Sequence, residues 1–235
     1  MMAFDVYVGP LARYYSGRWE NVAQEWARSN GATYHAIKIG EPAARETNLD
    51  VLRPEIVEWR AQLTEALGSN ISEPLDWDEL SDDYATARPN WDGWGSLVLW
   101  AAYEDHRDLK PPPRFTELPG DPAYQRSAAR DAETHYPHLI RDVEIWLPSR
   151  FDFTFKATAP VGDNVTYGST FTLLLNLRTL NERTWNADRA TIESWGETAP
   201  PRDAPLEEAA KYGFSDMLAL AEIACTRRMP MKLDY

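Results

Sequence analysis

The clearest folding signal in this chain lies in residues 142–185, DVEIWLPSRFDFTFKATAPVGDNVTYGSTFTLLLNLRTLNERTW. Apolar and polar residues alternate through 143–147 and again through 151–157, which is the period of a β-strand with two different faces. Gly162 and the two polar residues after it favour a turn, so we expect residues 165–167 to return as a strand. The stretch therefore predicts three strands, the last two forming a hairpin.

A helix is predicted directly after this hairpin. Ser169 or Thr170 can cap its start, because a side-chain oxygen accepts one of the free backbone N–H groups there. Leu173 and Leu177 begin an apolar stripe at helical spacing. The three phenylalanines of residues 151–157 alternate with polar residues, so we expect this aromatic face to pack on the leucine stripe.

The rest of the chain alternates strand-like and helix-like segments. Residues 4–8 and 33–39 read as strands on either side of a helix at 18–30, an order that suggests a βαβ unit with a parallel pair. Further helices are predicted at 55–67, with Pro54 as the first helical residue, and at 91–105, 122–133, 186–195 and 206–228. The pattern predicts an α+β fold, with a mixed β-sheet of about four or five strands and several packed helices.

The chain has 235 residues, and we expect them to form a single domain, residues 1–235. Residues 4–8 and 33–39 should then join the same sheet as the strands of the central stretch. The helices of residues 54–134 would be an insertion between these strands. Residues 110–120 contain three successive prolines and are the best candidate for a domain boundary, if one exists.

Composition limits the classes of partner. The net charge of −13 argues against nucleic acid and anionic membranes, because both bind basic surfaces, and it favours a basic protein partner. The ten tryptophans fit either an aromatic core or a recognition surface. Cys225, the one cysteine, cannot form an internal disulfide, which together with the lack of a signal peptide or an apolar membrane span predicts a cytoplasmic protein.

Four segments of the sequence carry a resemblance. They are DVYVGPLARYYSGRWE at 5–20, LPSRFDFTF at 147–155, GSTFTLLLNLRTLNERTW at 168–185 and KYGFSDMLALAEIACTRRMPMKLDY at 211–235. These segments resemble a group of uncharacterised bacterial cytoplasmic proteins, a likeness that implies no activity and no site residues. In general type, an acidic tryptophan-rich α+β protein is also similar to bacterial immunity proteins that neutralise toxins, although no diagnostic motif supports this second likeness.

Motifs for catalysis, metals and cofactors are weak. His135 and His138 have a spacing that zinc sites use, but no cysteine pair completes a site, so no metal is predicted. Asp105 and His106 are neighbours in a predicted helix and point in different directions, which disfavours an acid–base pair. The chain has no G-x-S-x-G turn and no glycine-rich phosphate loop, and no cofactor is predicted. A pair of carboxylates in a cleft is still possible, but the sequence selects none.

The most unusual chemical feature is the acidic segment, residues 72–83, SEPLDWDELSDD. Such charge runs are most often solvated surface. The alternative is a docking surface whose acids attract a basic protein and whose tryptophan anchors it. A second recognition edge could come from an aromatic loop, unless its rings pack on the first helix. The candidate partner-binding residues are Glu73, Asp76, Trp77, Asp78, Glu79, Asp82 and Asp83 of the segment, and Tyr14, Tyr15 and Trp19 of the loop.

These features favour a protein-binding inhibitor of the bacterial immunity or antitoxin type, which neutralises a basic toxin or enzyme by direct contact. One alternative is a hydrolase with a carboxylate and histidine active site, for which His106 is the candidate histidine. A second alternative is a homo-oligomeric scaffold module without catalysis. The sequence does not identify the partner or the oligomeric state.

Overall fold

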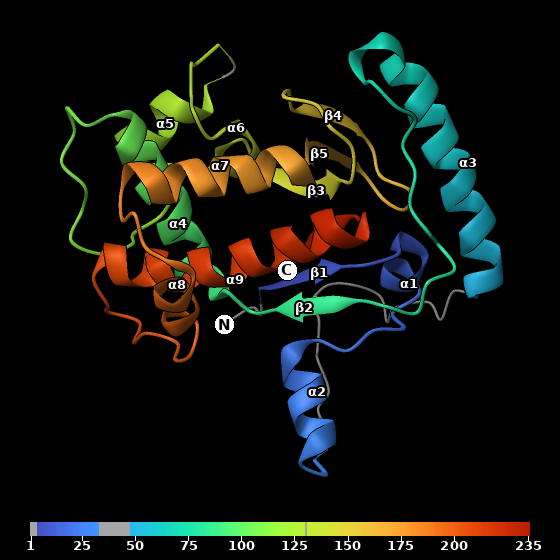
Figure 1. Ribbon diagram of the computed structural model, residues 1–235, viewed down its shortest axis with the longest axis horizontal. Coiled ribbons are helices and arrows are strands. Elements are labelled where there is room, and N and C mark those ends of the chain that lie inside the picture. Colours follow the sequence, from blue (N-terminus) through green and yellow to red (C-terminus); the bar gives the residue numbers. More distant parts are fainter. Residues whose placement is uncertain (1–3, 33–47, 130) are drawn as a thin grey trace.

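A computed structural model describes residues 4–32, 48–129 and 131–235 (Figure 1). The described residues form one mixed sheet with the strand order β2-β1-β6-β3-β5-β4, surrounded by helices. The predicted α+β class is confirmed, with a sheet slightly larger than expected. The strands are β1 (Asp5–Val8), β2 (Ala85–Ala87), β3 (Val143–Leu147), β4 (Phe155–Thr158), β5 (Asn164–Ser169) and β6 (Met231–Asp234).

The central stretch folds largely as its pattern predicts. β3 pairs parallel with β5, and β4 pairs antiparallel with β5, so the predicted hairpin is confirmed. Helix α7 (Thr170–Arg183) follows, and the Ser169 side chain caps it by accepting the N–H of Thr172. The leucines along one side of α7 are buried in the core, and α7 packs on β3, β5 and α9.

One boundary in this stretch was predicted incorrectly. The strand expected over residues 151–157 begins only at Phe155, and Phe151 is buried outside the sheet. The reason lies at the start of α7, where hydroxyl groups bond to the backbone of the approaching chain. Thr172 donates to the carbonyl oxygen of Phe151, and Ser169 donates to that of Ser149. These side chains bind the backbone that would otherwise extend the strand ladder.

Strand β1 shows how the two ends of the chain meet. It lies between β2 and β6 and pairs antiparallel with both, so the strand predicted at 4–8 does join the sheet of the central stretch. Strands β2 and β6 were not predicted, because each is short and close to a proline. The strand predicted at 33–39 lies outside the described residues.

Two long helices pack against each other next to α7, and one of them lies on the sheet. Helix α4 (Asn90–Asp105) packs against α9 (Leu206–Arg227), and α9 also contacts β1, β2 and β6 (Figure 1). Their backbones approach closely where two glycines meet, since a Cβ atom on Gly213 would clash with the carbonyl group of Gly93. The α4–α9 contact therefore depends on glycine at position 213.

Helix α3 (Leu49–Leu67) stands at one end of the molecule (Figure 1). It was predicted to begin at Pro54, but it begins after Asn48, whose side chain accepts the N–H of Asp50 and caps the helix. Trp59 fastens α3 to the sheet by donating its indole N–H to the carbonyl oxygen of Thr158 in β4 at 3.0 Å. The other helices are α1 (Leu11–Tyr15), α2 (Val22–Ser29), the 3-10 turn η1 (Gly68–Asn70), α5 (Pro122–Ala128), α6 (Pro137–Ile140) and α8 (Arg189–Trp195).

No helix of the described residues is both long enough and apolar enough to cross a bilayer. Three of the ten tryptophans, Trp77, Trp94 and Trp146, are buried, and six are partly exposed. Trp26 on α2 is 65% exposed.

Candidate functional site

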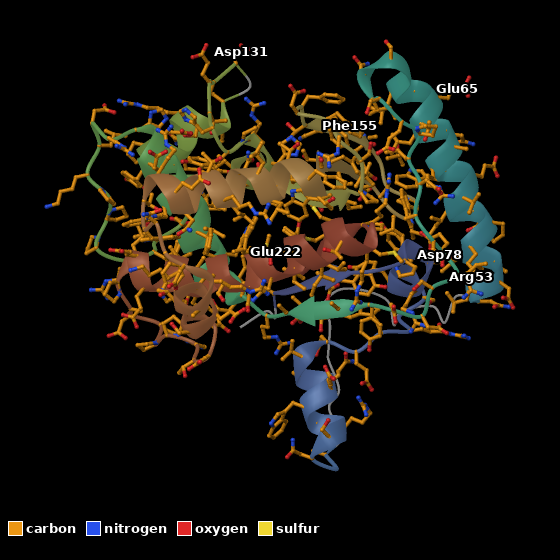
Figure 2. All side chains as sticks on the ribbon, in the orientation of Figure 1. Arg53, Glu65, Asp78, Asp131, Phe155 and Glu222 are labelled. Atoms are coloured by element: carbon orange, nitrogen blue, oxygen red, sulfur yellow. The ribbon has the colours of Figure 1, made fainter. Side chains whose placement is uncertain are left out.

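Much of the protein's negative charge is concentrated at one end of the molecule. We define the acidic edge as residues 48–83, which comprise α3 and the acidic segment that follows it. This part of the chain holds ten acidic residues and two arginines, a net charge of −8 out of −13 for the whole chain. Figure 2 shows Glu65, Asp78 and Arg53 along this edge, at the end of the molecule where α3 stands.

The acidic segment lies against α3 in an extended form. Its side chains alternate, so that Leu75, Trp77 and Glu79 are buried while Asp76 and Asp78 are exposed. This period of two is that of an extended chain with one face covered.

Arg60 of α3 holds the segment in place. Its guanidinium lies over the Trp77 ring at 4.8 Å from the ring centroid and donates to the Trp77 carbonyl oxygen at 2.6 Å. The same guanidinium lies 3.3 Å from an Asp76 carboxylate oxygen. Hydrogen bonding and cation–π contact therefore fix the backbone from which Asp76 and Asp78 project outward.

Two of the predicted partner-binding residues are part of the interior instead. The Glu79 carboxylate accepts the backbone N–H groups of Leu11 at 3.1 Å and Ala12 at 2.9 Å, at the start of α1, and also the indole N–H of Trp77. Glu79 and Trp77 are only 6% and 5% exposed. The assignment of these two residues to a docking surface is corrected, because the oxygens of Glu79 already satisfy free helix donors.

The remaining acids of the segment reach the surface. Glu73 pairs with Arg228 at 3.0 Å, and Asp82 pairs with Arg13. The side chains of Asp76 and Asp82 are nevertheless 79% and 87% exposed, so water screens these pairs strongly. Asp83 is exposed as well. These acids stay accessible to a partner, and their present pairs hold them only weakly.

The residues predicted as an aromatic loop are partly helical, because Tyr14 and Tyr15 form the end of α1. Rings of this aromatic loop pack on the sheet. Tyr14 and Trp19 lie with ring centroids 5.4 and 5.2 Å from that of Tyr7 in β1, and the Tyr14 hydroxyl donates to Asp234 at 2.7 Å. Tyr14, Tyr15 and Trp19 are each partly exposed. Burial raises the pKa of Tyr15 well above its usual range, so this phenol stays neutral. The loop therefore adjoins the acidic edge through the pair of Arg13 with Asp82, but most of its ring surface packs internally.

A second group of polar residues, the Glu104 cluster, lies where α4 ends. Its members are Glu104, Asp105, His135, Tyr136 and Arg183. The Glu104 carboxylate accepts hydrogen bonds from Tyr136 and from Arg183, the latter at 2.9 Å. Burial raises the pKa of Glu104, but the hydrogen bonds from Tyr136 and the neighbouring arginines outweigh it and lower the pKa below its usual value.

The Glu104 cluster contains the carboxylate–histidine pair that the hydrolase alternative requires, but the histidine is His135 and not His106. The His135 Nδ1 atom lies 2.7 Å from Asp105, and its Nε2 atom lies 3.2 Å from the Arg183 guanidinium. Because a guanidinium can only donate, Nε2 accepts and Nδ1 carries the proton toward Asp105. The Nε2 atom of His135 already accepts a hydrogen bond from Arg183. The contact of His135 with Asp105 therefore serves to connect α4, α7 and the loop before α6.

Two groups of residues that include His135 have the ligand types of a metal site, but the surroundings of each oppose metal binding. Glu104, Asp105 and His135 bring one ligand atom each within 4.8 Å of one another, but the charge of Arg183 on Glu104 opposes a cation there. His138 points elsewhere, as it is fully buried and its Nδ1 accepts the backbone N–H of Ser169 at 2.8 Å. His135 and His138 therefore lie in different surroundings.

The sequence could have revealed the acidic edge but not the Glu104 cluster. A charge count over 48–83, rather than over the acidic segment alone, already includes the four acids of α3. The contacts of Glu104 with Arg183 and of Glu79 with Leu11 join positions 79 and 68 residues apart. No local pattern marks contacts of that range.

Comparison with protein-family models, curated proteins and solved structures found no match to this chain. The resemblance seen in four segments of the sequence stays a prediction. Any functional argument therefore depends on the geometry of the described residues.

Proposed function

We propose that this protein is a cytoplasmic binding protein of the immunity or antitoxin type, which neutralises a basic toxin or enzyme by direct contact through its acidic edge. The observation that carries the proposal is the net charge of −8 confined to residues 48–83. A field of one sign at one end of the molecule attracts an oppositely charged protein and orients it during encounter.

The acidic edge also offers apolar contact area. Val51 and Val57 of α3 are 50% and 44% exposed, and Leu80 of the acidic segment is 71% exposed. Exposed acids, such as Glu55 and Asp78, stand between them. Charge alone gives weak and salt-sensitive binding, whereas apolar side chains that become buried slow dissociation. The combination suits a partner with basic groups around an apolar patch.

Direct contact accounts for inhibition without a reaction. Enzymes that act on nucleic acid carry basic surfaces, and an acidic protein that covers such a surface competes with the substrate. Four predicted partner residues are exposed on the acidic edge and belong to the proposed contact surface: Asp76, Asp78, Asp82 and Asp83. The single cysteine, Cys225, supports the cytoplasmic assignment, as this chain cannot form an internal disulfide.

The test begins with a partner captured from lysate of the source organism and continues with kinetics on the purified pair. One variant neutralises four acids of the edge, Glu55→Gln, Glu58→Gln, Asp76→Asn and Asp78→Asn. Its matched control neutralises four exposed acids at the other end of the molecule, Glu182→Gln, Glu197→Gln, Asp203→Asn and Glu208→Gln. Both variants change the net charge equally, so only the position of the charges differs.

We expect the edge variant to associate about tenfold or more slowly at low salt and to lose most of its salt dependence, because steering depends on local charge. The control should associate nearly as fast as the parent protein. Equal rates for the two variants would contradict the proposal. Sedimentation of the protein alone as a stable oligomer that hides the edge would favour the scaffold alternative instead.

A further inference from the structure

The structure contains an aromatic cavity at the end of the sheet opposite to the acidic edge. Strand β1 begins at this end, whereas its other end leads into α1, where Glu79 of the acidic edge binds. Because β6 and β3 run antiparallel to each other, and β6 antiparallel to β1, the end of β6 and the start of β3 lie here too. These strand ends and the first turns of α4 enclose a cavity of about 210 Å³.

Aromatic rings form much of the cavity wall. Phe4 precedes β1, Trp91 and Trp94 belong to α4, and Tyr235 follows β6. The Phe4 ring centroid lies 4.6 Å from that of Trp91 and 5.8 Å from that of Trp94, and the Trp91 centroid lies 5.4 Å from that of Tyr235. Three separate parts of the chain therefore bring four rings to one cavity, and the faces of such rings carry negative charge density.

Two carboxylates line the same cavity. Asp142 and Glu144 stand at the start of β3, and the Tyr124 hydroxyl donates to Asp142 at 2.6 Å. Tyr235 hydrogen-bonds Glu144 in turn. Among the described residues that line the cavity there is no lysine or arginine to neutralise these acids. Both carboxylates are thus held in place by phenols that carry no charge.

The backbone at Asp142 has an uncommon conformation. Its φ angle is 47°, in the left-handed region that a residue other than glycine enters at an energetic cost. The hydrogen bond from Tyr124 holds the side chain of this strained residue. Strained residues that the surroundings hold in place are concentrated at binding sites, and this one lies on the cavity wall.

We propose that this cavity binds a small organic cation of the alkylated ammonium class. Aromatic rings in the wall attract a cation, and its methyl groups replace water that apolar walls bind poorly. The two acids supply the countercharge. A bare metal ion does not suit the site, because two carboxylates among aromatic and aliphatic side chains supply few of the ligand atoms that it requires. An anion would meet two carboxylates and no base.

The decisive test compares choline with its uncharged analogue 3,3-dimethylbutan-1-ol, which has nearly the same shape, by calorimetric titration of the full chain. We expect choline to bind about tenfold or more tightly, because only the charged ligand gains from the ring faces and acids. Equal affinities would overturn the proposal. The absence of binding by both choline and tetramethylammonium at millimolar concentration would overturn it as well.

Two variants locate the binding site. Trp91→Leu removes a ring from the partly exposed wall, and Glu144→Gln removes one charge with little change in shape. Each should weaken choline binding about tenfold, whereas the control Trp26→Leu on the distant α2 should not change it. Thermal unfolding of each variant checks that the fold persists. If Trp91→Leu and Glu144→Gln both bind choline as the parent does, the cavity is not the site.

Discussion

The acidic edge and the Glu104 cluster are both rich in carboxylates, yet they use them in opposite ways. Side chains of the edge such as Asp76 and Asp82 are mostly exposed, and each has one arginine partner. Glu104 is buried and its two oxygens accept hydrogen bonds from several donors at once. An acid whose oxygens are used internally contributes to the fold, while an acid that faces water is available to a partner.

The same contrast exists within the acidic segment. Glu79 and Asp78 are adjacent in sequence, but Glu79 caps α1 and Asp78 projects into solvent. The extended backbone turns successive side chains to opposite sides. If the comparison is right, substitutions of buried polar groups should alter stability, and substitutions of exposed acids at the edge should alter only binding.

The largest expected effect concerns the buried histidine of the protein body. Burial lowers the pKa of His138 to about 4, so the folded protein binds its proton less readily than the unfolded chain. Stability is then present above the unfolded pKa and is lost as the pH falls from 6.5 to 4. The predicted loss from this one residue is about 3 kcal/mol at pH 4.

Chemical denaturation at pH 7 and pH 4 tests this prediction with His138→Asn, whose amide oxygen can still accept the Ser169 N–H. The parent should lose about 3 kcal/mol more stability than the variant between these two pH values. Burial raises the pKa of Asp216 to about 6, which acts in the opposite sense, so the difference between the two proteins is the meaningful quantity. An identical pH dependence would show that His138 is solvated.

Next in size is the loss of the Glu104 carboxylate. Glu104→Ala leaves the Tyr136 hydroxyl without its acceptor and removes the charge beside Arg183. We expect a decrease of about 2–3 kcal/mol in the free energy of unfolding, below the cost of a fully buried pair because Arg183 reaches water. Urea denaturation measures the free energy of unfolding of this variant and of Asp76→Ala. The value for Asp76→Ala should stay within about 0.5 kcal/mol of the parent, because that acid is exposed.

The smallest loss of stability among the three buried groups should come from Glu79→Gln. The amide keeps one acceptor oxygen, but its NH₂ group meets an N–H donor at the start of α1. We expect a loss of about 1–2 kcal/mol by urea denaturation, whereas Asp78→Asn next to it should change stability by less than about 0.5 kcal/mol. Similar losses for both variants would break the distinction between inward and outward acids.

Much of the fold could be read from local patterns. The alternation of apolar and polar residues predicted β3, the turn before β5 predicted the hairpin, and the spacing of leucines with Ser169 as cap predicted α7. Strand β2 was not predicted, because it has only three residues and follows the acidic segment. Its ladder partners in β1 lie about 80 residues away, and only the folded sheet brings them together.

The sequence by itself determined the fold class, the central hairpin and its helix, and the large negative charge. These properties follow from periodicity, turn chemistry and composition, which act locally or as sums over the chain. Only the tertiary structure decided which acids face inward, that His135 and not His106 meets Asp105, and that Phe4, Trp91 and Tyr235 share one cavity. The physical reason is that hydrogen bonds and ring contacts between distant segments depend on the register and approach of whole elements, which no local pattern encodes.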